Sequence, residues 1–529
     1  MQPVDPIQAI NLIKKNRDNF ITYNVACLRE LIRYLPSNKF NLFHKIPFLM
    51  NINSPNYPGY IKHPEIVYGI YGFEKSGFLE VSLKSYRLTL DQIQPYLSKQ
   101  PIVLGLYLMG SAGTLAQGIH SDFDYWVVID NASCTTNQRK RFTEKLHTIE
   151  SWALNKSNQH VTFFVMDLEQ IQNNVYSSLD EESSGTAQKT ILKEEFYRTF
   201  ILVAGKIPFW AVLPVGLSNQ DYAQWIHVLT QKDPDQFINQ HFIDTGNLTC
   251  IDQKECISAI LWQVFKARND PAKSFLKAAL ICSYYFFQDQ ERLPCEIIKQ
   301  RYGDRELDSF LIDPYTVIFE KTLSFFEKLN DIELLELVRE CILLRLCGFP
   351  LVSMPNTSTP KFNLLETYIK NWQWTSKHIN YLIDYPKWFE QEKIDYERKL
   401  VLKIAFLYEL VVRSHTSKTN DGQDMEHIRL LSHWISRYFQ KKEAKIEGCS
   451  TYLKTKSSTL SLLISYEHNE HQRKLWSVFD HSLFNVIKQE QLLFIGKEFL
   501  VAVGWIIINK LYKKAKSILH FQPNRLNTT

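Results

Sequence analysis

Residues 106–128 read LYLMGSAGTLAQGIHSDFDYWVV and form the most informative segment of the chain. It begins with a short apolar run that ends in a Gly-Ser pair, Gly110 and Ser111. After a ten-residue spacer, Asp122 and Asp124 open a second apolar run. Because side chains alternate across a β-strand, two carboxylates that stand two residues apart lie on one face of it. The stretch therefore predicts two strands, with a glycine turn after the first and paired carboxylates at the head of the second.

The residue types of this stretch favour a metal and phosphate site. Two carboxylates on one strand edge repel each other unless a cation lies between them. Oxygen ligands of this kind suit Mg²⁺, with Mn²⁺ as an alternative, and Mg²⁺ usually takes further ligands from substrate phosphates. Gly110 allows the backbone to approach a phosphate, and Ser111 offers its amide and its hydroxyl. We therefore interpret Asp122 and Asp124 as metal ligands.

A lone DxD pair is common on protein surfaces, so the argument depends on the order of the elements. A strand, a Gly-Ser pair, a spacer and a DxD at the head of the next strand are typical of the polymerase-beta-type nucleotidyltransferase fold. That fold also needs a third carboxylate on a neighbouring strand. The apolar run 161–167 ends in Asp167, which we interpret as the third metal ligand or a general base. The alternative is that Asp167 only caps the turn or helix that follows the strand.

The rest of the chain predicts an α+β protein, with a nucleotidyltransferase-like mixed sheet domain followed by a largely helical region. Short apolar runs and helical patterns alternate in the first part. The segments that carry this prediction are strands at 102–109, 125–129 and 161–166, helices at 7–36, 137–154 and 191–203, and a surface loop and candidate lid at 176–189. The predicted domains are 1–220, which is catalytic with a helical N-terminal segment, 221–413, which is helical, and 414–529, which is mixed.

Composition excludes several classes of protein. The 529 residues carry a net charge of only +5, which does not call for a nucleic-acid surface. Nine scattered cysteines without a CxxC pair argue against a zinc ribbon or a disulfide framework. The longest apolar run, Phe499–Ile508, is shorter than the ~20 residues of a membrane-spanning helix. We interpret it as a buried helix, with membrane contact as the alternative, and expect a soluble, cytoplasmic protein.

The run GSAGTLAQGIHSDFDYWV at 110–127 closely resembles the corresponding run of the class I adenylate cyclases. The resemblance covers residues 50–410 well and 411–529 loosely. It departs from the family at 112–114, where the family is rich in serine. The family's long C-terminal regulatory region has no counterpart, so the chain resembles a catalytic half. Further similar segments follow in the same order: NYPGY at 56–60, EFYRT at 195–199, AGK at 204–206, LWQ at 261–263, DPY at 313–315 and LVR at 337–339.

This resemblance implies cyclisation of ATP to 3′,5′-cyclic AMP and pyrophosphate with Mg²⁺. It implies that Lys206 contacts the substrate, and Arg198 is a further candidate for stabilising phosphate charge. Trp126 either stacks on adenine or packs in the core, and both readings stay open. The family's active-site motif falls on Ser111, Ser121, Asp122, Asp124 and Trp126.

Two other functions stay open. One is a nucleotidyltransferase that acts on a protein, an RNA or a small molecule, since it would need the same metal site. The other is a non-catalytic nucleotide-binding relic. We expect an ATP substrate, no nucleic acid, no membrane span and activity without an added protein; the sequence does not identify a regulatory partner.

Overall fold

The computed structural model describes residues 5–118, 121–176, 188–231, 236–304, 311–350, 352–388, 390–419, 430, 433, 437, 446, 461–468, 474–481 and 491–523. The chain divides into two compact units. The first consists of Met1–Ser258 and Tyr284–Lys321, and the second of Ala259–Ser283 and Thr322–Thr529. The boundaries expected at 220 and 413 stay predictions. Most of the predicted loop at 176–189 lies outside the described residues.

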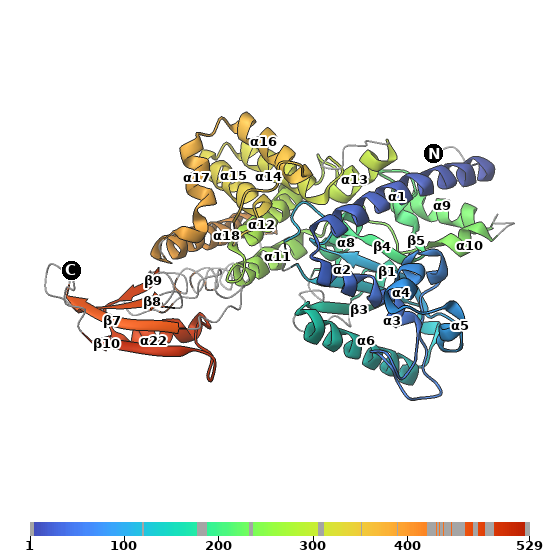
Figure 1. Ribbon diagram of the computed structural model, residues 1–529. Coiled ribbons are helices and arrows are strands. Elements are labelled where there is room, and N and C mark those ends of the chain that lie inside the picture. Colours follow the sequence, from blue (N-terminus) through green and yellow to red (C-terminus); the bar gives the residue numbers. More distant parts are fainter. Residues whose placement is uncertain are drawn as a thin grey trace. The chain divides into compact units, whose positions relative to one another are not determined.

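The first unit holds the predicted sheet and the helices around it (Figure 1). Its strands are β1 (Val103–Met109), β2 (Phe123–Ile129), β3 (Val161–Asp167), β4 (Ile201–Gly205), β5 (Ile207–Pro208) and β6 (Phe242–Ile243). Its helices are α1 (Pro6–Tyr34), α2 (Ser37–Phe43), α3 (Lys45–Asn51), α4 (Phe78–Tyr86), α5 (Leu90–Ile93), α6 (Thr136–Ser157), α7 (Leu168–Gln172), α8 (Lys189–Thr199), α9 (Asn219–Gln231), α10 (Phe237–His241) and α13 (Pro294–Gly303).

The main sheet has the strand order β3-β2-β1-β4. Strand β1 runs antiparallel to β2 and β4, whereas β2 and β3 are parallel. The three strands expected from the sequence are confirmed. The helix expected over 191–203 is wrong at its end, because α8 stops at Thr199 and β4 begins two residues later. The resulting mixed sheet, with a largely helical region after it, confirms the expected α+β class.

Strand β2 is buried on both faces, and its two faces pack against different helices. The odd-numbered residues, among them Phe123 and Tyr125, join a hydrophobic core that also contains Phe142 of α6. Trp126 points to the other face, where its ring stacks on Phe196 of α8 at a centroid distance of 4.2 Å. Asp124 is two residues from Trp126 and therefore lies on the same face of the sheet as Trp126.

Strand β4 lies at an edge of the sheet, and α1 covers its unpaired backbone. The side-chain amide of Asn24 donates to the carbonyl oxygen of Leu202 at 2.9 Å and accepts from its N–H at 2.8 Å. These two bonds replace those of a neighbouring strand. The long first helix is thereby tied to the sheet, and the edge is closed to other chains.

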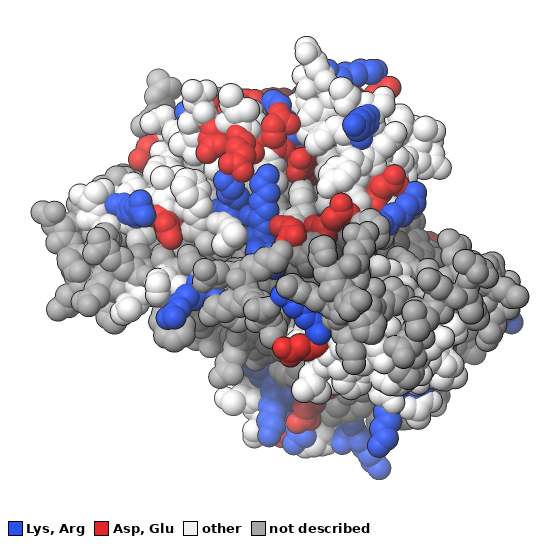
Figure 2. Space-filling view, turned by 90° about the vertical axis from the view of Figure 1, so that its left-hand side faces the viewer, with Lys and Arg blue, Asp and Glu red and all other residues white. Residues whose placement is uncertain are grey.

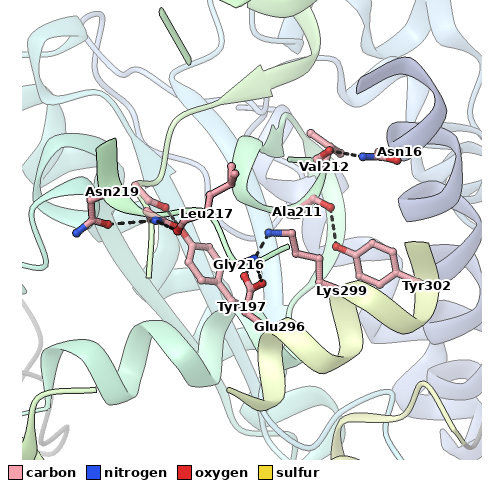
Figure 3. A network of polar contacts seen from close by, with 12 residues as sticks. Asn16, Tyr197, Ala211, Val212, Gly216, Leu217, Asn219, Glu296, Lys299 and Tyr302 are labelled. Atoms are coloured by element: carbon pink, nitrogen blue, oxygen red, sulfur yellow. Dashed lines mark hydrogen bonds and ion pairs between the residues drawn. The ribbon is translucent and has the colours of Figure 1, made fainter. Parts of the chain in front are cut away.

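Helix α13 is distant in sequence but belongs to the same unit as the sheet. Its Glu296 accepts from the backbone N–H of Gly216 at 2.8 Å and pairs with Lys299 at 3.2 Å. Its Tyr302 donates to the carbonyl oxygen of Ala211 at 2.6 Å. Figure 3 shows these contacts together with the bond from Asn16 of α1 to the segment that follows β5. Buried polar groups of this segment are thus satisfied by two helices.

The second unit combines helices with a second sheet of order β10-β7-β8-β9. Figure 2 shows several places where basic and acidic side chains lie next to each other. None of the helices in the described part of the chain is both long enough and apolar enough to cross a bilayer. The unit contains α15 (Ile332–Leu346), α16 (Pro360–Trp372), α17 (Ser376–Ile383), α18 (Glu390–Thr419), β7 (Ser461–His468), β8 (Lys474–Asp480), β9 (Gln491–Gly496), α22 (Phe499–Ile508) and β10 (Ile518–Pro523). The unit boundaries fall within α11 (Gln253–Lys266), α12 (Pro271–Phe287) and α14 (Pro314–Leu329).

Candidate active site

The turn after β1 brings the Gly-Ser pair beside the carboxylates. Met109 is in register with Asp124, so Gly110 follows directly at the same end of the sheet. Gly110 has φ +93°, a conformation that favours glycine. A Cβ built on Gly110 would lie 3.9 Å from Oδ2 of Asp124. The backbone of Gly110 and the carboxylate of Asp124 thus line the same space.

Two serines from either end of the spacer meet at this point. The hydroxyl oxygens of Ser111 and Ser121 are 3.1 Å apart. The Ser121 hydroxyl also accepts from the N–H of Gly118 at 3.0 Å. The backbone carbonyl oxygen of Ser121 accepts from the side-chain amide of Gln159 at 2.9 Å. The structure thus brings Ser111 and Ser121 together next to the turn at Gly110.

Buried side chains hold the loop between these serines. The carboxylate of Asp313 accepts from the N–H of Leu115 at 2.9 Å. The Gln117 side chain accepts from the N–H of Gly113 at 2.6 Å. Both anchoring side chains are buried, so these hydrogen bonds are shielded from water. These two bonds therefore hold residues 113–117 in place before any ligand binds.

The two carboxylates differ in exposure. Asp122, just before β2, is exposed, whereas Asp124 within the strand is partly buried. Lys39 of α2 lies close enough to interact electrostatically with Asp122. Burial lowers the pKa of Lys39, and the charge of Asp122 partly opposes that shift. A cation from the N-terminal helices thus adds positive charge beside the carboxylates.

These donors fit one magnesium ion completed by substrate oxygens. No cluster of three or more His, Cys, Asp or Glu residues that could hold a metal occurs in the part of the chain that the structure describes. Mg²⁺ is commonly held by one or two protein carboxylates, with water and substrate phosphates as the other ligands. Asp122 and Asp124 supply such a pair, and the open space at Gly110 leaves room for phosphate oxygens.

The prediction that Asp167 converges on these carboxylates is wrong. Strand β3 does lie beside β2, but the two are parallel, so Asp124 faces Thr162 and Asp167 faces Ile129. Five residues of extended chain separate the two positions, about 16 Å along the strands. The buried Asp167 carboxylate instead accepts from the N–H of Asn131 at 3.0 Å. The alternative, a cap on the helix that follows the strand, does not describe it either: Asp167 is the N-cap residue of α7, but its side chain makes no cap hydrogen bond to that helix.

Lys206 also lies at the opposite end of the sheet. Strand β4 ends where Gly205 faces Gly105 of β1, and the backbone N–H of Lys206 donates to Leu104 at 2.8 Å. The Lys206 ammonium lies over the ring of Tyr71, 4.5 Å from its centroid. The substrate contact that the resemblance implies for Lys206 therefore does not fit a substrate bound at Asp122 and Asp124. The Ala-Gly-Lys segment at 204–206, which resembles the family, therefore lies at the end of strand β4.

Helix α8, which carries Arg198, packs on the face of the sheet that holds Trp126 and Asp124. Both Arg198 and Trp126 are nevertheless buried in packing contacts. The Arg198 Nε donates to both carboxylate oxygens of Glu194 at 3.1 Å, and only 4% of Arg198 is exposed. Trp126 is 1% exposed, and one face of its ring is occupied by Phe196. Neither a phosphate contact for Arg198 nor adenine stacking for Trp126 fits these environments.

The sequence reasoning missed three residues that shape the site. Thr199 accepts the N–H of Gly110 at 3.0 Å, which fixes the turn after β1. Asp313 accepts from the N–H of Leu115, and Lys39 interacts electrostatically with Asp122. Two of them lie in segments already noted as similar to the family, EFYRT and DPY. That similarity was a usable signal, whereas nothing in the sequence around Lys39 indicates its position.

Comparison with known proteins gives a consistent result. The family described as "Adenylate cyclase NT domain" matches residues 12–211. The family described as "Adenylate cyclase, class-I, second domain" matches residues 251–450. The two matched regions follow one another in the chain and together take in the sheet, the Gly-Ser turn, both carboxylates and Asp313. No solved structure matches the chain significantly.

Individual relatives carry the same name. An adenylate cyclase of Escherichia coli O6:H1 is 29% identical over 364 residues, which is 68% of this chain and 41% of the relative. One from Haemophilus influenzae is 24% identical over 503 residues, 90% of this chain and 57% of the relative. One from Shigella flexneri is 30% identical over 311 residues, 58% of this chain and 36% of the relative. The chain thus matches between about a third and somewhat over half of these relatives' length, and it belongs to the class I adenylate cyclase family.

Proposed function

We propose that this chain converts ATP to 3′,5′-cyclic AMP and pyrophosphate. The observation that carries the proposal is the convergence of Gly110, Ser111, Ser121, Asp122 and Asp124 at one end of the sheet, in a chain of this family. Because the chain matches only part of its relatives, the activity of the whole relatives is extended to it here as a proposal. The proposal includes a cytoplasmic location, where ATP is available.

In the reaction, the ribose 3′-oxygen attacks the α-phosphorus in line with the bond to the departing pyrophosphate. The new O3′–phosphorus bond forms as the bond to the bridging oxygen breaks, and the hydroxyl loses its proton. The turn at Gly110 lets phosphate oxygens approach the backbone, and the hydroxyls of Ser111 and Ser121 donate to them. Because Thr199 and Asp313 hold this loop, its donors need little reorganisation as charge develops.

The paired carboxylates are the proposed metal ligands. A bound Mg²⁺, or Mn²⁺ in its place, would neutralise phosphate charge and lower the pKa of the attacking hydroxyl. Asp122 and Asp124 would hold that ion from one side, while the triphosphate provides the remaining ligands. Lys39, beside Asp122, would add a positive charge that favours binding of the triphosphate.

The test is a product analysis with the purified chain. ATP and Mg²⁺ or Mn²⁺ are supplied without any other acceptor, and cyclic AMP and pyrophosphate are quantified by chromatography. Asp124→Asn should lower the rate by ~10³-fold, in line with the loss of a single electrostatic contact in other enzymes. Asp91→Asn, which changes an exposed carboxylate on α5, is the matched control and should retain the rate.

Three results would contradict the proposal. A folded Asp124→Asn protein with the normal rate would remove the carboxylates from the chemistry. Transfer of AMP to an added acceptor without cyclic AMP would favour another nucleotidyltransferase. Metal-dependent binding of ATP without turnover would favour a nucleotide-binding relic.

A further inference from the structure

Helix α22 in the second unit is apolar on all sides, although only one side is buried. Its Ala502, Trp505 and Ile506 pack against the second sheet. On the opposite side, Leu500 is 75% exposed and Ile507 is 64% exposed. These two residues are seven apart and therefore share one face of the helix. Helices that are apolar all round are normally covered on all sides, so this outer face is unusual for a surface exposed to water.

Strand β10 extends the exposed apolar surface. It lies at an edge of the second sheet, where Leu519 is 48% and Phe521 is 53% exposed. The ring of Phe521 lies 5.7 Å from that of Phe499, the first residue of α22. Phe521 and Leu519 alternate onto the same face of the strand. The outer face of α22 and the exposed face of β10 thus lie on the same side of the sheet.

The segment between α22 and β10 is strongly basic. It contains Lys510, Lys513, Lys514 and Lys516, all exposed, and Tyr512, which is partly exposed as well. No acidic residue occurs anywhere from 499 to 523 in the sequence. Four lysines therefore follow, in the chain, the helix that carries Leu500 and Ile507. We name the outer face of α22, the segment 510–516 and β10 the basic apolar surface.

We propose that the basic apolar surface docks on a lipid bilayer that contains anionic headgroups. Exposed aliphatic residues beside a cluster of lysines are the features that hold a protein at a bilayer interface. This is contact from one side of the membrane and involves no spanning helix.

Other occupants of the surface fit less well. Single-stranded nucleic acids are usually bound by stacking on aromatic side chains, whereas the most exposed apolar side chains of this surface, Leu500, Ile507 and Ile518, are aliphatic. A second copy of the chain would bring two sets of four lysines together, and like charges at short distance repel. An anionic bilayer satisfies both the charge and the apolar side chains.

The experiment is vesicle flotation with the full chain. Neutral phosphatidylcholine vesicles are compared with vesicles that contain phosphatidylglycerol, at low and at high salt. The chain should float with the anionic vesicles and much less with the neutral ones, and high salt should weaken binding because it screens the lysines. Lys513→Gln combined with Lys514→Gln should weaken binding about 25-fold, about fivefold for each lysine. The control pair, Lys370→Gln with Lys377→Gln, lies on α16 and α17 and should bind as the unaltered chain does.

A second pair of variants tests the apolar part. Leu500→Ser with Ile507→Ser should weaken binding about tenfold or more, since both side chains would enter the bilayer. Ile332→Ser with Tyr381→Ser changes exposed apolar residues elsewhere and should have no effect. Absence of flotation with anionic vesicles, or equal loss with the control pairs, would overturn the proposal. So would a concentration-dependent dimer that the Leu500 and Ile507 changes abolish, because a second copy would then be the occupant.

Discussion

Replacing Asp167 by asparagine tests whether the metal site uses two carboxylates or three. Asp124 and Asp167 stand five register positions apart on parallel strands, about 16 Å. Two oxygens bound to one Mg²⁺ lie ~2.1 Å from the ion and so no more than ~4 Å from each other. Asp167 cannot reach an ion held by Asp124 without the sheet coming apart. Asp167→Asn should therefore leave the rate of cyclic AMP formation within about twofold, whereas Asp124→Asn should lower it by ~10³-fold.

The Asp167 variant should instead show a small loss of stability. The amide oxygen of asparagine can still accept from the N–H of Asn131, but without the negative charge, which costs about 1 kcal/mol. For a unit of this size that loss lowers Tm by about 2–4 °C. Initial rates and thermal unfolding are measured on the same preparations. A folded Asp167→Asn protein that loses more than about 100-fold in rate would refute the geometry, because the carboxylate would then have to reach the metal.

Two further changes test the surroundings of the site, and a third tests the buried Lys145 of α6, which donates to the carbonyl oxygens of Ile52 and Gly59. Thr199→Val removes the acceptor of the Gly110 N–H and should cost about 1–3 kcal/mol in urea unfolding and about tenfold in rate, while Thr199→Ser should restore both. Trp126→Phe should lower stability by about 1–2 kcal/mol with an unchanged KM for ATP, and a KM raised more than about tenfold would mean that the indole contacts adenine. Burial lowers the pKa of Lys145 from 10.5 to about 7, so between these pH values the unfolded chain holds a proton that the folded chain has released. The free energy of unfolding therefore rises with pH across that window, by up to about 1.4 kcal/mol per pH unit from this group. Lys145→Met should flatten the increase of the urea midpoint with pH. An unchanged dependence of the midpoint on pH would contradict the lowered pKa.

The core of the site could be read from the sequence because its geometry is local. The alternation of β2 sets the side of the sheet on which Asp124 lies. The register of Met109 with Asp124 brings the Gly-Ser turn beside the carboxylates. Short-range rules of this kind hold wherever the strand forms, since Cβ atoms alternate at every residue.

Asp167 could not be placed from its own strand alone. Its apolar run predicted β3 and its neighbour correctly, but the direction of β3 decided which end of the sheet Asp167 occupies. The connection from β2 to β3 runs through α6, a crossover that returns the chain and makes the two strands parallel. The end of β3 then lies with the end of β2, away from Asp124. The predicted helix at 137–154 already implies this direction, since two strands joined through a helix of that length are normally parallel.

The sequence by itself determined the α+β class, three of the four strands of the main sheet, and a glycine turn with paired carboxylates at the head of β2. The distant groups that surround them depend on how the whole chain folds. Arg198 turns to Glu194 one helical turn away, Lys206 lies over Tyr71, and Lys39 and Asp313 come to the site from far along the chain. The physical reason is that backbone alternation and turn chemistry act over a few residues. The partner of a charged side chain depends on strand direction and helix packing, which the whole chain sets together.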